Sequence, residues 1–301
     1  MAPVSTAARP FGALLTAMVT PMAPDGSVDV AAAVALAEHL VEHGHDGLVL
    51  NGTTGEAPTT HAPEKAELVR AVVEAVGHRA YVIAGAGSND TAHAVRMAEQ
   101  AAEAGAHGLL VVTPYYSRPS QEGVYRHTVS VADATDLPVM LYDVPGRTAV
   151  RYSAETLDRL AEHPRVVAVK DATGDTQSAL RHITRTGLAW YSGDDGLLLP
   201  FLAVGAVGLV SMSAHLVGDE LAEVIRSFDA GDHGKARALF ADLLPVIDVI
   251  CGSGNGALRS KTALHLMGLI PSPTMRLPHA GADEAETAHV RDVLAAAGLL
   301  P

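Results

Sequence analysis

Short apolar runs alternate with longer amphipathic segments along most of the chain. The runs predict eight strands, at residues 14–19, 47–50, 81–85, 108–112, 138–142, 166–170, 188–192 and 208–212. Between them lie segments such as residues 29–44, where apolar positions recur at spacings of three and four, as in an amphipathic helix. Strands separated by helices in this way pair in parallel through crossover connections.

Eight strand–helix units predict an α/β fold, the (β/α)8 TIM barrel. The units cover about 225 residues, close to the roughly 250 that such a barrel takes. A doubly wound open sheet competes, but it usually has fewer strands and often a glycine-rich phosphate loop, which we do not find. After residue 215 only helical patterns follow. We therefore expect a barrel domain in residues 1–230 and a small C-terminal helical bundle in residues 231–301.

Composition and charge exclude several classes of function. The net charge of −13 disfavours binding to nucleic acids and anionic membranes, so we expect neither as a partner. No apolar run approaches the roughly 20 residues of a membrane span. The run after Arg9 is about as long as a short signal-peptide core, but Gly12 and Thr16 interrupt it, and we expect a strand there. Because Cys251 is the only cysteine, we expect a reducing, cytoplasmic location.

Residues that can carry chemistry gather directly after the expected strands. In a barrel of this type, the carboxyl ends of the strands form the active-site face. The sequence places there NGTTGE at 51–56, TPYY at 113–116, YDVPGRT at 142–148, Lys170, and SGDD at 192–195. These strand ends supply hydroxyls, phenols, one arginine and one lysine, and no obvious metal-binding cluster.

Lys170 stands at the end of the apolar strand VVAVK, where a charged group is costly. The other lysines of the chain stand in polar, helix-like segments: Lys65, Lys235 and Lys261. Apolar surroundings favour a neutral amine, which is the nucleophile that Schiff-base formation with a carbonyl substrate needs. The alternative is a structural lysine paired with a carboxylate such as Asp171 or Asp194.

Hydroxyl groups on neighbouring strand ends favour the catalytic interpretation. Schiff-base chemistry needs a proton relay, and Tyr142, Thr53 and Tyr116 lie on three of the other strand ends. Ordinary packing with incidental hydrogen bonds is the alternative for each of them. A threonine-rich turn that opens toward a helix also presents N–H groups and hydroxyls suited to a carboxylate.

Four motifs together resemble one known family. GTTGE, VTPYY, YDVPGRT and VKDATGD, in this order and each at the end of an expected strand, resemble the dihydrodipicolinate synthase family within the N-acetylneuraminate lyase superfamily of class I aldolases. The resemblance runs from about residue 11 to the end of the chain. The PGRT portion favours the synthases over the sialic acid lyases, which usually lack that arginine.

The resemblance implies four catalytic residues. Lys170 matches the Schiff-base lysine, and Tyr142 matches the tyrosine that shuttles protons during condensation. Thr53, the first threonine of GTTGE, matches the relay threonine. Tyr116, the second tyrosine of PYY, matches the relay residue that crosses from a neighbouring subunit.

The resemblance also implies four substrate-binding residues. Thr54 matches the threonine that holds the pyruvate carboxylate, and Arg147 matches the arginine that receives the carboxylate of the second substrate. Gly193 and Val210 match positions that line the pyruvate pocket.

The implied reaction joins pyruvate to L-aspartate 4-semialdehyde in the diaminopimelate and lysine branch. The Schiff base is the electron sink, so we expect no cofactor and no metal, and we expect a homotetramer built from tight dimers. A sister pyruvate-dependent aldolase or dehydratase acting on a sugar-derived 2-keto acid would share everything except the partner-substrate site. A catalytically silent barrel that senses a keto acid is a third possibility, against which the joint presence of the four catalytic residues argues.

Many family members also bind lysine at the dimer interface as a feedback inhibitor, through an acidic residue on the helix after the third strand. This sequence keeps Asn89 and Tyr115 of that site but has His93 at the acidic position. Lys65 and Ala62 stand where the family has histidines. We therefore expect weak inhibition by lysine or none.

Overall fold

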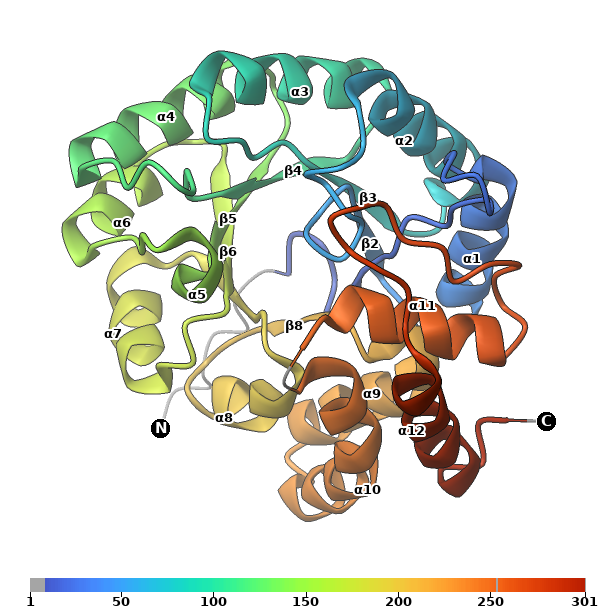
Figure 1. The fold of residues 1–301 in the computed structure, drawn as a ribbon. Helices are drawn as coiled ribbons and strands as arrows, with labels where there is room; N and C mark the ends of the chain where they lie inside the picture. The colour runs from blue at the N-terminus through green and yellow to red at the C-terminus, as the bar shows by residue number, and fades with distance from the viewer. Residues whose placement is uncertain (1–8, 253, 301) are drawn as a thin grey trace.

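The computed structural model describes residues 9–252 and 254–300. Its core is a closed barrel of eight parallel strands that pair in sequence order, with β8 returning to β1 (Figure 1). The strands are β1 (Leu14–Ala17), β2 (Gly47–Leu50), β3 (Tyr81–Gly85), β4 (Gly108–Val112), β5 (Val139–Asp143), β6 (Val166–Asp171), β7 (Ala189–Ser192) and β8 (Gly208–Ser211). The predicted TIM barrel is confirmed.

The strand bounds follow the apolar runs closely, and two differences have local causes. The run at 138–142 becomes a strand only from Val139, because Pro138 has no N–H to donate to the ladder. The run at 208–212 ends one residue early, because the Met212 amide donates to the Asp195 carboxylate, with N–O distances of 3.2 Å.

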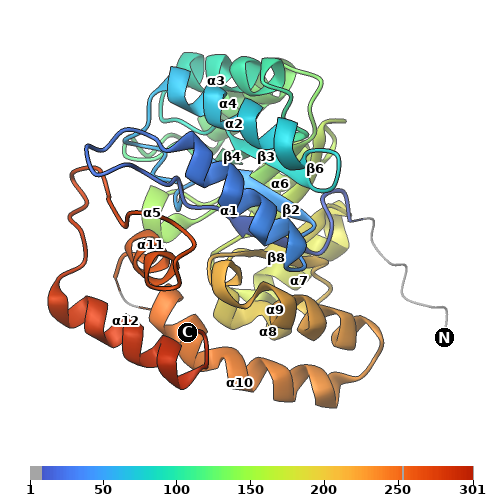
Figure 2. The ribbon, with the colours of Figure 1, turned by 90° about the vertical axis from the view of Figure 1, so that its right-hand side faces the viewer.

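Helices surround the barrel and continue beyond it (Figures 1 and 2). The helices that lie between strands are α1 (Val30–Glu42), α2 (Ala62–Val76), α3 (Thr91–Glu103), α4 (Gln121–Asp133), α5 (Pro145–Thr148), α6 (Ala154–Ala161), α7 (Thr176–Thr186), η1 (Asp195–Leu197) and α8 (Leu198–Ala203). After β8 follow α9 (Ala214–Asp229), α10 (His233–Cys251), α11 (Gly256–Leu266) and α12 (Glu284–Ala296). Figure 2 shows α10 and α12 forming a layer below the barrel, with α11 between that layer and α5.

Short polar side chains fix where the outer helices begin. Each accepts a hydrogen bond from an amide of the first helical turn, which would otherwise have no partner inside the helix. For α1, α3, α4, α6 and α7 these residues are Asp29, Asp90, Ser120, Ser153 and Asp175. The amphipathic spacing visible in the sequence therefore becomes a ring of helices with well-defined starts.

Apolar side chains form two layers, one inside the barrel and one between the strands and the helices. On β6, Ala168 belongs to the inner layer and Val169 to the outer layer. Because successive side chains of a strand point to opposite faces, Lys170 points inward and Asp171 outward. Alternation along β6 thus aims the lysine at the barrel axis.

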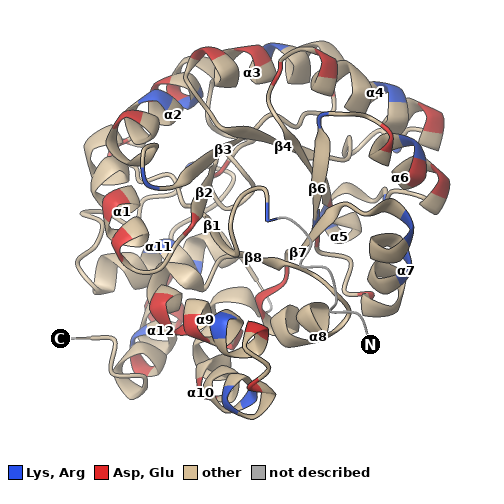
Figure 3. Ribbon diagram, turned by 180° about the vertical axis from the view of Figure 1, so that it is seen from behind, with Lys and Arg blue, Asp and Glu red and all other residues tan. Residues whose placement is uncertain are grey.

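Charged side chains lie mainly on the outer helices, while the strands are almost free of them (Figure 3). This distribution is what the low cost of charge in water and its high cost in the core require. Within the part of the chain that the structure describes, no helix is long and apolar enough to cross a membrane.

One expectation about the lysines is wrong. Lys261 lies on α11, but its side chain is 0% exposed. It donates a hydrogen bond to the carboxylate of Glu56, which stands 205 residues away in the sequence. The local sequence around Lys261 could not reveal this burial, because its partner Glu56 lies in the turn that follows β2.

Candidate active site

Lys170 and Tyr142 lie side by side at the carboxyl ends of β6 and β5. They are direct partners in the pairing of the two strands. The Nζ atom of Lys170 lies 4.5 Å from the centre of the Tyr142 ring. Lys170 is 5% exposed and Tyr142 is 6% exposed, so both groups meet in a shielded place. A reactive amine and a proton-carrying phenol are therefore within reach of one small substrate.

The structure does not pair Lys170 with a carboxylate. Asp171 points away and accepts hydrogen bonds from the Trp190 indole and the Thr173 amide, both at 2.8 Å. Asp194 accepts from the Gly196 amide at 3.2 Å. Among residues 9–252 and 254–300, no ion pair involves Lys170. In the described residues, the alternative of a structural lysine paired with Asp171 or Asp194 therefore finds no support.

A buried carboxyl pair lies behind this arrangement, on the outer face of the sheet. Asp143 and Asp171 are neighbours in the pairing of β5 with β6. Burial, and after it the negative charge of Asp171, raise the pKa of Asp143 to about 7. Near neutral pH, a part of the molecules therefore carries a neutral Asp143.

Gly193 and Val210 complete the surroundings of the lysine. A Cβ at Gly193 would lie 3.0 Å from Cγ of Lys170 and 3.0 Å from the Asp171 carbonyl oxygen, so a side chain there would displace the lysine. Val210 is buried on β8 and belongs to the same inner apolar layer as Tyr142. The structure thus brings both predicted pocket residues to the inner end of the barrel that holds Lys170.

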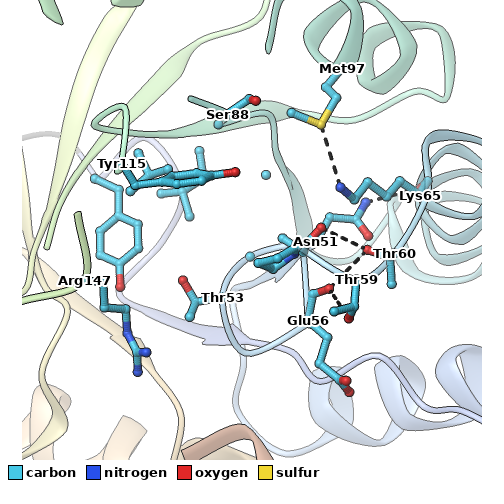
Figure 4. A pocket seen from close by; sticks show the side chains of 18 of the residues that line it. Asn51, Thr53, Glu56, Thr59, Thr60, Lys65, Ser88, Met97, Tyr115 and Arg147 are labelled. Carbon is cyan, nitrogen blue, oxygen red and sulfur yellow. Dashed lines mark hydrogen bonds between the residues drawn. The ribbon is translucent and has the colours of Figure 1, made fainter. Parts of the chain in front are cut away.

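A cavity of about 670 Å³ opens above these residues, at the carboxyl ends of the strands (Figure 4). Four of the eight predicted residues line it: Thr53, Tyr116, Tyr142 and Arg147. The other four are not lining residues: Lys170, Thr54, Gly193 and Val210. Since the Lys170 amine lies against the Tyr142 ring, Tyr142 connects the buried lysine to the open cavity.

The turn that follows β2 carries the two predicted threonines. We call residues 51–60 the threonine turn. Thr53 is exposed toward the cavity, whereas Thr54 is 4% exposed. The turn crosses close to β3, where a Cβ at Gly85 would lie 2.2 Å from the Asn51 carbonyl oxygen. Only glycine at position 85 lets the turn lie this close to the barrel mouth.

Arg147 and Tyr115 stand on the opposite side of the cavity from Lys65 (Figure 4). Arg147 lies on the short helix α5, and its side chain is exposed. Within the described ranges its guanidinium makes no hydrogen bond and no ion pair, so its charge is available to a ligand. Tyr116 is 87% exposed and has a left-handed backbone, with φ of 75°.

The same cavity extends to a second group of polar side chains near α2 and α3. Lys65 is partly buried, and its ammonium lies 3.8 Å from the Met97 sulfur. Burial lowers the pKa of Lys65. His93, on α3, also lines the cavity. Among the described residues that line the cavity, Glu56 is the only one with a carboxylate, and that group accepts a hydrogen bond from Lys261. This end of the cavity therefore lacks a free negative charge.

Comparison with known proteins identifies the family of this chain. The sequence profile described as the Dihydrodipicolinate synthetase family matches residues 10–297. The chain belongs to this family. The resemblance based on four motifs is thereby confirmed, over almost the whole chain.

Relatives in the family are similar along their full length. The 4-hydroxy-tetrahydrodipicolinate synthase of Bifidobacterium longum is 55% identical over 291 residues, which are 97% of this chain and 96% of the relative. The 4-hydroxy-tetrahydrodipicolinate synthase 2 of Streptomyces coelicolor is 54% identical over 299 residues, 99% of each chain.

Solved structures of the family share the fold. The dihydrodipicolinate synthase of Bacillus anthracis has a TM-score of 0.91 at 42% identity, covering 97% of this chain and 99% of the other. The enzyme of Cyanidioschyzon merolae, solved with lysine bound, has a TM-score of 0.93 at 39% identity, covering 97% of this chain and all of the other.

The family motifs also contain residues to which the sequence reasoning gave no role. Glu56 ends the motif GTTGE, lines the cavity and is 2% exposed. Thr148 ends YDVPGRT, and its hydroxyl accepts a hydrogen bond from Thr113 at 2.9 Å, which ties α5 to the end of β4. An acidic residue inside an otherwise uncharged turn was a visible sign in the case of Glu56. Its partners could not be read from the sequence.

Proposed function

We propose that this chain condenses pyruvate with L-aspartate 4-semialdehyde to give 4-hydroxy-tetrahydrodipicolinate, in diaminopimelate and lysine biosynthesis. It is a lyase of the class I aldolase type. One observation carries the proposal: Lys170, the expected Schiff-base residue, is buried without a carboxylate partner in the described residues and lies against Tyr142, which lines the cavity. The family and the names of the relatives support the choice of reaction.

The proposed reaction begins at the Lys170 amine. The neutral amine attacks the ketone carbon of pyruvate, and loss of water gives an imine. A proton leaves the methyl group, the electron pair moves toward the iminium nitrogen, and an enamine forms. The enamine carbon attacks the aldehyde of the second substrate. The amine of that substrate then displaces the Lys170 nitrogen as the ring closes, which frees the lysine.

Hydroxyl groups carry the protons in this scheme. Tyr142 is the shuttle, because its ring contacts the Lys170 amine. Thr53 lines the same cavity and links Tyr142 to Tyr116 in the proposed relay. Thr54, on the same turn, holds the carboxylate of pyruvate. Gly193 and Val210 shape the space around the imine.

Arg147 receives the carboxylate of the second substrate in this proposal. Its guanidinium is exposed at the cavity and has no protein partner in the described ranges. A guanidinium can bind a carboxylate through two parallel hydrogen bonds, which also fixes the orientation of the aldehyde. The position of Arg147 favours a second substrate that carries a carboxylate of its own, in addition to the carboxylate of pyruvate. It disfavours a sugar-derived keto acid.

The proposed assembly is a homotetramer, a dimer of dimers. The support is Tyr116, a large aromatic residue that is 87% exposed at the cavity mouth in a left-handed backbone conformation. Such strain persists where function or contacts require it. We also propose the domain division into a catalytic barrel, residues 1–230, and a C-terminal helical region, residues 231–301.

Replacement of the lysine tests the covalent step. Pyruvate with borohydride is expected to add one reduced pyruvate per chain, and Lys170→Ala is expected to abolish the adduct. Lys65→Ala is the matched control, because Lys65 also lines the cavity and its loss leaves the amine of Lys170 intact. Intact-mass and peptide mass spectrometry measure the adduct. An adduct that survives in Lys170→Ala contradicts the mechanism.

Substitution of Arg147 tests the choice of second substrate. Arg147→Ala is expected to lower kcat/KM for aspartate semialdehyde by about 30-fold or more, the equivalent of roughly 2 kcal/mol for a lost charged contact. Imine formation with pyruvate is expected to change by less than about threefold in the same variant. Arg147→Lys restores little, because lysine lacks the planar fork. Equal losses in both steps would assign Arg147 a structural role instead.

Subunit mixing tests whether Tyr116 serves a neighbouring site. In a two-fold dimer each subunit gives its Tyr116 to the other, so a mixture of Tyr116→Phe and Lys170→Ala contains one complete site per mixed dimer. Refolded mixtures are expected to regain activity that neither variant has alone. A fully active monomer in sedimentation velocity, or mixtures that stay inactive, would contradict this assembly.

Lysine is expected to inhibit this chain weakly or not at all. A bound lysine places its ammonium in a site where the structure offers His93 and Lys65 and no free carboxylate among the cavity-lining residues described. The missing partner costs about 2–5 kcal/mol, or about 30-fold or more in affinity. A dose–response curve at neutral pH measures this. Half-inhibition at micromolar to low-millimolar lysine would contradict the prediction, and His93→Glu is the variant expected to increase inhibition.

A further inference from the structure

The threonine turn holds a backbone geometry that its own sequence does not favour. Asn51 and Glu56 both have left-handed backbone conformations, with φ of 55° and 56°. Asparagine tolerates this region, but glutamate rarely adopts it and keeps it only where its surroundings determine it. Something outside the turn therefore has to hold the segment that carries Thr53 and Thr54.

Inside the turn, the backbone of Glu56 is the central hydrogen-bonding group. Its N–H donates to the Thr53 carbonyl at 3.1 Å. Its carbonyl accepts from the Thr59 and Thr60 amides at 2.9 Å and 3.2 Å. The hydroxyl of Thr59 donates to the same carbonyl at 3.1 Å. A shift of Glu56 would thus be transmitted directly to Thr53.

The side chain of Glu56 points away from Lys65 and Asn51 (Figure 4), and its carboxylate contacts the C-terminal region. One carboxylate oxygen accepts a hydrogen bond from the Lys261 ammonium on α11, and the other accepts from the Arg276 amide at 3.0 Å. The Lys261 ammonium also donates to the Thr274 carbonyl at 2.7 Å. Burial lowers the pKa of Lys261, and the hydrogen bond with Glu56 opposes that effect.

The segment that supplies these partners we call the C-terminal strap, residues 272–279. Figure 1 shows it, in orange-red, passing across the face of the barrel next to the turn after β2. Arg276 fastens the strap by donating to the Gly26 and Thr59 carbonyls, at 2.7 Å and 2.8 Å, and by pairing with Glu64 on α2. The Arg276 guanidinium lowers the pKa of Glu64 to about 2.

The buried Glu56–Lys261 pair is expected to add little to the stability of the fold. Both charges are almost fully buried, and desolvation offsets much of their attraction, so an apolar pair of the same size would stabilise the fold about as well. A buried ion pair does, however, fix its partners in one geometry through directed hydrogen bonds. We infer that Glu56 is a positioning residue, which together with Lys261 and the Arg276 amide holds the threonine turn in its working geometry.

This inference rests on the proposed roles of Thr53 and Thr54. It extends the proposed function by making the C-terminal region part of the active-site support. A misplacement of about 1 Å in catalytic groups can lower a rate by about 100-fold. Glu56→Gln is therefore expected to lower kcat/KM for pyruvate by about 10–100-fold. Because Lys170 is untouched, the variant is still expected to form the borohydride adduct at saturating pyruvate.

Glu64→Gln is the matched control. Glu64 also anchors the strap through Arg276, but it lies on α2 and does not belong to the threonine turn. Its kcat/KM is expected to stay within about threefold of the wild type. Hydrogen exchange of amides 51–60 provides a readout without substrate: protection is expected to fall in Glu56→Gln and to stay unchanged in Glu64→Gln. That readout stands even if the proposed reaction is wrong, which the wild-type borohydride trap reports separately.

A double variant separates positioning from stability. Lys261→Met in the Glu56→Gln background removes the unpaired buried ammonium and is expected to restore part of the lost thermal stability. Activity and amide protection in the turn are expected to remain low, because methionine at position 261 cannot donate the hydrogen bond that holds residue 56. Recovery of activity in parallel with stability, or equal effects of Glu56→Gln and Glu64→Gln on the turn, would overturn the inference.

Discussion

The pairing of β5 with β6 is the constraint on which the site depends. It places Tyr142 beside Lys170, and the alternation of side chains along both strands turns the two groups to the inside of the barrel. A slip of one residue would exchange them for Asp143 and Asp171, which now lie on the outer face. The sheet therefore separates the lysine amine and the tyrosine phenol on its inner face from a pair of carboxyl groups on its outer face.

Burial alone gives Lys170 its place, whereas directed contacts hold the groups around it. Lys170 points into the barrel because side chains alternate along β6, and it has room there because Gly193 has no side chain. The threonine turn and α5 are not strands, and each is held by a hydrogen bond from a residue outside it. Lys261 donates to Glu56 of the turn, and Thr113 donates to Thr148 of α5. The barrel fixes the position of Lys170, and the long-range polar contacts fix the positions of the threonine turn and α5. This division is typical of functional loops on a stable scaffold.

Much of this could be predicted from the sequence, because the information is local. Apolar runs located all eight strands, and motifs at their ends located Lys170, Tyr142, Thr53 and Arg147 within one site. Lys261 shows where local reasoning stops. Its segment reads as polar and helical, yet its ammonium is buried against a carboxylate 205 residues earlier in the chain. The pattern of apolar and polar positions within α11 carries no information about so distant a partner.

Through the buried pair, the region after the barrel contacts the turn that lines the cavity. Lys261 and Arg276 lie beyond the eighth strand, yet they contact the turn that follows the second. Two unlike charges in a dry interior are tolerated only together, so the turn, which carries Glu56, and α11, which carries Lys261, depend on each other for stability. Local opening of either segment would leave a buried charge exposed to an apolar core. The turn and α11 are therefore held to each other by contacts of defined direction, which apolar packing at the same place would not provide.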